Sequence, residues 1–274
     1  MFQRSLQIAA LIALAVRARA ECTATRATMQ DSADTFLASQ AMGMSVHLPY
    51  MPNFTYWEND KQIDIKNGII NKHITLAFNR SIIDTTACAS FIEIIVADEK
   101  NQYQIGTQIR YEPNGRYINK IETMLTKPGD WFFNATNALN YARSETWAPI
   151  PEAKRDTRAV IKAAGDAYLD RFGSNKTVVP WGLPCARLEG GRYFGGNKPT
   201  DTCDIGMPAA GGLPMWNRRY VIDEVMGVVD IFVSFGGTET RPGSPDTHEF
   251  RVEGGKIRYV HTMTAQGSNS TRTT

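Results

Sequence analysis

The sequence predicts a protein of the α+β class with two tandem cone-shaped domains, each built from an N-terminal helix and a curved antiparallel sheet. Two observations support this fold class. Four blocks of sequence recur in the same order in the two halves of the chain, which indicates an internal duplication. Within each half, a helical pattern precedes several runs that alternate apolar and polar residues, as half-buried strands do.

The first twenty residues have the features of a secretory signal peptide. Arg4 supplies a positive start, residues 5–16 are mostly apolar, and Ala18 and Ala20 match the small-x-small pattern of a cleavage site. The alternative is a membrane anchor, but a bilayer span needs about 20 apolar residues. We expect cleavage after Ala20, a secreted protein, and no membrane span in the mature chain.

The mature chain has the composition of a glycoprotein from an oxidising compartment. Removal of residues 1–20 discards three arginines and no acid, so the formal net charge changes from +2 to −1. This charge offers no electrostatic basis for binding nucleic acid. The four cysteines predict two disulfides. Five sequons predict glycosylation at Asn53, Asn79, Asn134, Asn175 and Asn269.

The repeated blocks predict where each half begins and which strands correspond. Residues 31–40 resemble residues 162–171, and both read as a helix that places an aromatic residue and Leu against a core. Residues 49–58 resemble residues 180–189. When Arg80 is aligned with Arg219, Asp84 falls opposite Asp223 and a β-rich run follows each. A strand, a glycine-containing turn and a second strand then close each half, so we expect a pseudo-dimer within one chain.

The two halves are separated by a proline-containing segment, WAPIPEAKRD, which suits a boundary. The second half also carries an insertion, roughly residues 190–216, that is rich in Gly and Pro. The predicted organisation is a signal peptide at 1–20, a first domain at 21–134, a linker at 135–154, a second domain at 155–265 and a disordered tail at 266–274.

This layout also predicts the disulfide pairing. Four cysteines allow three pairings. Cys22 and Cys88 lie in the first copy, whereas Cys185 and Cys203 lie in the second, on either side of the start of the insertion. Because domains fold as units, we expect Cys22–Cys88 and Cys185–Cys203.

The chain resembles an uncharacterised family of secreted fungal proteins with SnoaL-like domains. The resemblance is carried by PWGLPCARLEGG, NRRYVIDEVMGVVDIFVSFGG and DTHEFRVEGGKIRYVHTMT in the second half, and by NRSIIDTTACASF, IGTQIR and KPGDWFFNAT in the first. It covers roughly residues 22–265 and implies the cone-shaped fold of nuclear-transport-factor-like proteins and a secreted location. It implies no reaction, because proteins of this fold include isomerases, cyclases, dehydratases, epoxide hydrolases and binding modules.

Several kinds of site are absent from the sequence. There is no G-x-S-x-G elbow, P-loop, Rossmann glycine pattern or H-E-x-x-H, and no cysteine or histidine cluster has metal-ligand spacing. Gly190 and Gly191 are interpreted as turn glycines. We therefore predict no metal and no cofactor.

Two histidines of the second half are candidate catalytic residues. Strand alternation places His248, and separately His261, on the same face as apolar neighbours, so both are expected to point into the cone. Neutral imidazole can serve as acid or base near pH 7. The first half has Thr107 and Glu122 at these positions, which indicates that the scaffold does not require histidine there. The alternative is a hydrogen-bonded histidine of the core or rim.

Asp223 is the third candidate, since it could orient His261 or act as a base. Because Asp84 repeats it in the first half, a structural salt bridge or turn cap is the alternative.

These candidates lead to two hypotheses of function. The first is a cofactor-independent acid/base enzyme, a cyclase, isomerase or dehydratase (lyase), acting on a small apolar metabolite of secondary metabolism. His261 and Asp223 would transfer protons, and His248 would polarise the substrate. The second is a non-catalytic secreted glycoprotein that binds a small molecule or a surface partner. A cavity that contains both histidines and Asp223 would favour the enzyme, and a solidly packed inner face would favour the second hypothesis.

Overall fold

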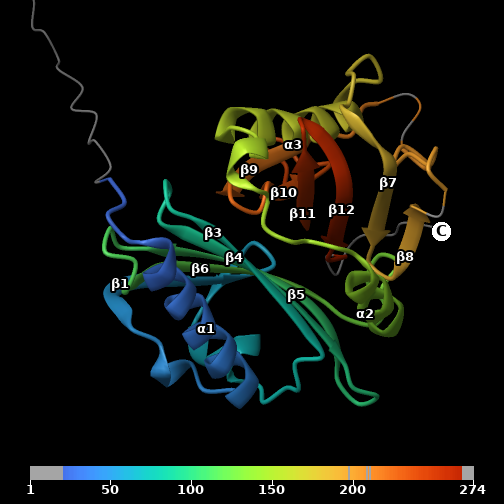
Figure 1. Cartoon of the computed structure of the whole chain (residues 1–274). Helices are drawn as coiled ribbons and strands as arrows, with labels where there is room; N and C mark the ends of the chain where they lie inside the picture. Colours follow the sequence, from blue (N-terminus) through green and yellow to red (C-terminus); the bar gives the residue numbers. More distant parts are fainter. Residues whose placement is uncertain (1–20, 197, 208, 210, 267–274) are drawn as a thin grey trace, which may run out of the picture.

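The computed structural model describes residues 21–196, 198–207, 209 and 211–266. Within these residues the chain forms two curved six-stranded sheets, each preceded by a helix (Figure 1). This arrangement confirms the predicted α+β fold with two tandem cone-shaped units. The expected signal peptide, the sequon at Asn269 and residues 267–274 of the expected tail lie outside the described residues.

The first half, a name used below for helix α1 and strands β1 to β6, begins with a capped helix. The Thr25 side chain accepts a hydrogen bond from the Thr28 backbone N–H, and the helix ends at Gly43, whose φ of 68° suits glycine. The elements are α1 (Arg26–Met42), η1 (Ser45–His47), β1 (Tyr50–Glu58), β2 (Lys61–Ile63), η2 (Ile65–Asn67), η3 (Ile69–Asn71), β3 (Phe78–Asp84), β4 (Ala89–Ala97), β5 (Gln102–Tyr111) and β6 (Ile118–Thr126).

The second half, a name used below for helix α3 and strands β7 to β12, repeats this order. Thr157 caps its helix as Thr25 caps α1. The elements are α3 (Arg158–Gly173), β7 (Trp181–Glu189), β8 (Arg192–Gly195), β9 (Met215–Asp223), β10 (Val228–Phe235), β11 (Ser244–Glu253) and β12 (Lys256–Thr264). The strand orders, β2-β1-β6-β5-β4-β3 and β8-β7-β12-β11-β10-β9, are identical, as expected of an internal duplication.

Each sheet contains one parallel pair, which corrects the expectation of wholly antiparallel sheets. β1 runs parallel to β6, and β7 runs parallel to β12. The remaining neighbours are antiparallel and joined largely by short turns. The first strand of each half is instead far in sequence from the last strand, with which it pairs. No hairpin therefore sets the relative direction of these two strands.

Helix α2 (Ala135–Ser144) and the turn η4 (Glu152–Lys154) lie between the two halves. The sequence analysis did not predict α2. Asn134 caps it by accepting a hydrogen bond from the Asn137 backbone N–H, and the helix ends before the first proline of the segment. Ala138 and its neighbours pack α2 against a small cluster that includes Ile95 and Leu188, so the segment joins the two halves.

Each half encloses its own core between helix and sheet. Phe36 of α1 and Tyr168 of α3 are buried in these cores, as predicted from the helical pattern. A third cluster joins the outer faces of the two sheets. Its buried members are Ile82, Ala89, Phe91, Met124, Val221, Val228, Phe232 and Met263. The two halves thus share an apolar interface within one chain.

A β-bulge in each half changes which face its last strand presents. In β12, Ile257 pairs with Val252 and Tyr259 pairs with Arg251, so Arg258 is an additional residue between the two pairs. β6 has the same irregularity at Asn119. An inserted residue inverts the alternation of side chains beyond it.

Both predicted disulfides, Cys22–Cys88 and Cys185–Cys203, are present and no described cysteine is free. This is the usual chemistry of a secretory-pathway protein. Among the described residues, no helix has the length and apolarity required to cross a bilayer.

Candidate functional site

The second half contains a cavity of about 340 Å³ between α3, the inner face of the sheet and the loop after β8. Its volume lies near the lower end of the range of small-molecule sites, about 300–1,000 Å³. The cavity is lined by Trp131, Tyr168, Phe172, Arg187, Glu189, Gly206, Met207, Leu213, Phe235, Asp246, His248, Thr262 and Thr264. Apolar walls thus surround a small group of charged and polar side chains.

Arg187 of β7 fixes the loop that covers the cavity. Its Nη1 donates to the Cys203 carbonyl at 2.7 Å and its Nη2 donates to the Ile205 carbonyl at 2.6 Å. Nη2 also lies 3.3 Å from a Glu189 carboxylate oxygen. The side chain is 3% exposed, and its Nε is buried without a hydrogen-bond partner among the described residues.

His248 of β11 points into the cavity, as strand alternation predicts. Its Nδ1 lies 3.5 Å from Asp246 Oδ1, too far for a hydrogen bond, and has no hydrogen-bond partner in the described part of the chain. Burial, followed by the positive charges of Arg187 and Arg218, lowers the pKa of His248 to about 3. The imidazole is therefore neutral near pH 7, with one nitrogen as donor and the other as acceptor.

The equivalent interior of the first half is packed with side chains. Tyr56 of β1 occupies the position of Arg187, because each pairs with the matching residue of the last strand. Its hydroxyl donates to Glu58 Oε2 at 2.9 Å, and the Ile69 backbone N–H donates to the same oxygen. Ile70 is fully buried beside them. Of the two halves, the second carries the open cavity lined by His248.

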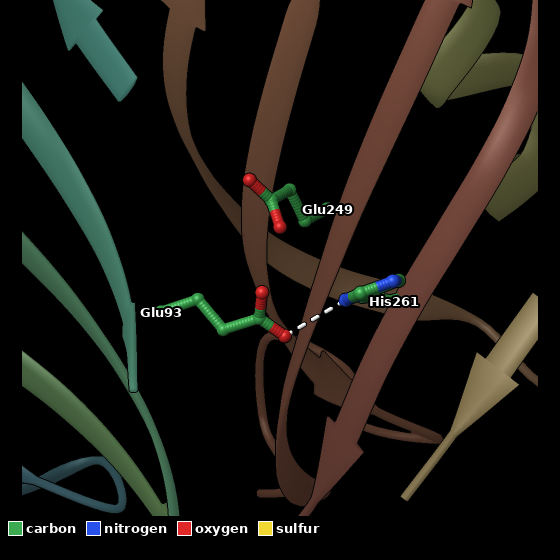
Figure 2. A group of neighbouring side chains, drawn as sticks. All are labelled: Glu93, Glu249 and His261. Atoms are coloured by element: carbon green, nitrogen blue, oxygen red, sulfur yellow. Dashed lines mark hydrogen bonds and ion pairs between the residues drawn. The ribbon is translucent and has the colours of Figure 1, made fainter. Parts of the chain in front are cut away.

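His261 does not face this cavity, which corrects the expectation that both histidines point into the cone. The bulge at Arg258 turns His261 to the outer face, opposite Glu249, and places Thr262 opposite His248. The imidazole instead contacts the first half and the linker. Nδ1 hydrogen-bonds to Glu93 Oε1 at 2.8 Å (Figure 2). Nε2 hydrogen-bonds to Glu145 Oε2 at 2.7 Å.

Arg80 occupies the centre of this buried group. Its Nη2 lies 2.7 Å from Glu93 Oε2, 2.6 Å from Glu249 Oε2 and 3.2 Å from His261 Nδ1. Glu93, Glu249 and His261 are close enough together to ligate a metal ion. The guanidinium is already within hydrogen-bond distance of all three, so it supplies the positive charge that a metal would bring.

The pKa shifts of His261 and Glu93 favour an ion pair between these two residues. Burial alone would lower the pKa of His261, but the charges of Glu93 and Glu145 raise it to about 10. Burial would raise the pKa of Glu93, but His261 and Arg80 lower it to about 2. His261 is thus a cation and Glu93 an anion near pH 7. The geometry is that of a structural contact between the two halves.

Asp223 also lies at this interface, away from the cavity. It accepts two hydrogen bonds from Arg26, at 2.7 and 2.6 Å, and one from the Ile83 backbone N–H. Asp84 forms the mirror-image contact with α3 and β9, through Arg158 at 2.7 Å for each oxygen and the Ile222 backbone N–H. The two aspartates therefore form a reciprocal clasp between the halves, the salt-bridge alternative named from the sequence.

Of the polar residues that line the cavity, the sequence analysis identified His248 and missed the others, including Arg187 and Asp246. A signal for Asp246 was present, because residues i and i+2 of a strand share a face and His248 was already placed inward. Arg187 lies in the repeated block at 180–189, but its counterpart Tyr56 is not charged, so the repeat did not mark it.

The described sequon asparagines are all exposed, as expected of glycosylation sites. These are Asn53, Asn79, Asn134 and Asn175. Two of them have local roles, since Asn134 caps α2 and the Asn175 side-chain amide donates to the Ala209 carbonyl.

Comparison with known proteins places a family match on the second half. A family model described as "Domain of unknown function (DUF8021)" matches residues 154–264, which include α3 and strands β7 to β12. Among solved structures, a crystal structure of an NTF2-like protein from Bacteroides fragilis NCTC 9343 is similar at 10% sequence identity and a TM-score of 0.20. That match covers 86% of this chain and 94% of the other. No curated protein matches the chain.

Proposed function

We propose that the second half binds a small, largely apolar molecule that carries an oxygen acceptor. The observation that supports this proposal is a pair of buried nitrogens on residues that line the cavity, Arg187 Nε and His248 Nδ1, which lack a hydrogen-bond partner among the described residues. An unsatisfied buried polar group costs about 1–3 kcal/mol. A ligand oxygen within reach would offset part of that cost, while the aromatic and aliphatic walls would bury the rest of the molecule.

The polar atoms of the cavity favour a neutral ligand over a strongly charged one. Arg187 is already paired with Glu189 and with two loop carbonyls, and Asp246 adds a second acid to the lining. A carbonyl or hydroxyl oxygen can accept from the free nitrogens without adding charge to this buried site.

Acid/base catalysis in the same cavity is the second candidate function, and the proximity of Asp246 and His248 favours it. The neutral His248 would donate a hydrogen bond to a ligand carbonyl. Asp246 would remove a proton from the carbon beside that carbonyl and return it to a neighbouring atom of the same ligand, as in an isomerisation. His261 and Asp223 lie in the interface between the halves, so we do not include them in this site.

The proposed setting of this protein is the secretory pathway. The two disulfides and the exposed sequon asparagines support it. Cleavage after Ala20 and occupancy of the sequons belong to the same proposal.

Binding can be tested with 6-propionyl-2-dimethylaminonaphthalene, a neutral fluorescent ketone whose emission shifts to the blue in apolar surroundings. We expect the full chain to bind it. His248→Leu should weaken binding about 3–10-fold, the equivalent of one hydrogen bond. Thr264→Phe, which places a ring in the cavity, should abolish binding. Thr107→Val is the matched control, because Thr107 occupies the His248 position in the packed first half, and it should bind like the wild type.

Equal binding by the wild type, His248→Leu and Thr264→Phe, at unchanged melting temperatures, would contradict the binding proposal. The same ketone has exchangeable protons beside its carbonyl, so it also tests catalysis. If Asp246 acts as a base, the wild type should accelerate deuterium exchange at that carbon, observed by NMR, and Asp246→Asn should not. Binding without accelerated exchange would leave the protein as a binding module.

A further inference from the structure

We propose that the segment after β6, which leads out of the first half, supplies one wall of the cavity in the second half, and that Trp131 on this wall determines which ligands fit. This inference rests on the proposed ligand-binding function. Trp131 follows β6 and belongs to the segment that leaves the first half, yet it lines the cavity with residues of α3 and β11. It also lies outside residues 154–264, the part matched by the family model.

Several hydrogen bonds hold this segment in place. The Trp131 indole N–H donates to Glu189 Oε1 at 2.6 Å, and Glu189 in turn lies beside Arg187. The Gly191 backbone N–H donates to the Phe132 carbonyl at 2.8 Å. Asp130 accepts a hydrogen bond from the Gln266 backbone N–H, just beyond β12. The segment is thus bound to the β7–β8 turn and to the residue just beyond β12, at the end of the sheet where these two parallel strands both finish.

The glycine pair between β7 and β8 allows the segment that contains Trp131 to approach the second half closely. A Cβ on Gly190 would lie 2.6 Å from the Trp131 carbonyl oxygen, and one on Gly191 would lie 2.3 Å from the Asn134 Cβ. Gly190 also has a φ of 59°. The turn glycines named from the sequence therefore have a specific role, because any side chain there would push the segment and Trp131 away from the cavity.

The chemistry of Trp131 suits a wall that selects by size and shape. Its only hydrogen-bond donor is committed to Glu189, so the indole ring offers the ligand apolar and π contacts. Tyr168, Phe172 and Phe235 supply further rings in the same lining. A ligand that fills the cavity would contact Trp131 while its oxygen reached the polar side chains, and a longer one would collide with the indole.

The experiment compares two ketone probes that differ only in their acyl chain, the propionyl and the lauroyl derivatives of 2-dimethylaminonaphthalene. We expect Trp131→Ala to weaken propionyl binding about 2–10-fold, the worth of an aromatic contact. The same variant should bind the lauroyl probe more tightly relative to the propionyl probe, because the wall is removed. Trp131→Phe should restore most of the wild-type preference.

Trp216→Ala is the matched control, because Trp216 is an exposed tryptophan of the second half that does not line the cavity. It should leave both affinities unchanged. A general loss of stability would weaken both probes alike, so the ratio of affinities separates a selective wall from a structural residue. An unchanged ratio in Trp131→Ala, with His248→Leu still impaired, would overturn this inference alone. If His248→Leu and Thr264→Phe also bind normally, the proposed function itself fails.

Discussion

Replacing His261 with glutamine tests the assignment of this residue to the interface between the two halves. Glutamine has a similar size but carries no charge, so Glu93 and Glu249 would keep Arg80 as their cation, whereas Glu145 would lose its ion pair with residue 261. A pKa moved from 6.5 to about 10 corresponds to about 5 kcal/mol, at roughly 1.4 kcal/mol for each pKa unit. Breaking a buried ion pair costs about 3–5 kcal/mol.

We therefore expect the melting temperature of His261→Gln to fall by about 6–20 °C, because 1 kcal/mol corresponds to about 2–4 °C in large domains. The assay is thermal unfolding followed by calorimetry and circular dichroism. Glu122→Gln is the matched control, because Glu122 occupies the His261 position in β6. Its carboxylate contacts Lys120 and Arg219 and is 10% exposed, so we expect a smaller loss of about 1–2 kcal/mol.

The pH dependence gives an independent readout. The pKa of His261 is raised in the folded state, so its contribution to stability is complete below pH 6.5 and is lost as the pH rises through about 10. The pKa of Glu93 is lowered, so its contribution is present above pH 4.5 and is lost as the pH falls through about 2. The two contributions coincide between pH 4.5 and 6.5.

His261→Gln should remove the loss of stability on the alkaline side, whereas Glu122→Gln should retain it. The reasoning is refuted if His261→Gln melts within about 2 °C of the wild type and keeps the wild-type dependence on pH.

Two further predictions concern the clasp and the covalent state of the chain. Arg158→Ala should destabilise the protein by about 2–4 kcal/mol, because the buried carboxylate of Asp84 loses its ion-pair partner, whereas Arg116→Ala on the exposed surface should have no measurable effect in the same unfolding assay. The intact mass after enzymatic removal of glycans should fit a chain that begins at Glu21 and has no free thiol. Two reactive thiols under denaturing, non-reducing conditions would contradict the two disulfides.

Much of the fold could be predicted because its signals are local or repeated. The repeated blocks align Asp84 with Asp223, and the structure places both at the end of equivalent strands, β3 and β9. The disulfide pairing followed from the position of each cysteine within its half. The inward orientation of His248 followed from strand alternation, since no irregularity separates it from the apolar residues used to assign its face.

The orientation of His261 could not be predicted in this way, because alternation holds only along an unbroken ladder. The bulge at Arg258 depends on how β12 pairs with β11, and no residue type in KIRYVHTM marks it. The partners of His261 are also remote, since Glu93 is 168 residues away in the sequence. The raised pKa of His261 could not be predicted either, because it results from two carboxylates that other segments of the chain supply.

The sequence by itself determined the duplication, the disulfides and the histidine of the cavity, because these depend on periodicity and on the order of residues along the chain. The tertiary structure alone decided which candidates meet. Docking of the two outer sheet faces assigned His261 and Asp223 to ion pairs between the halves. Closure of the second cone brought Arg187, Asp246 and His248 around one cavity, and Trp131, from the segment after β6, completes its lining. Such contacts join segments that are far apart along the chain, and no local sequence pattern indicates which of these segments will meet.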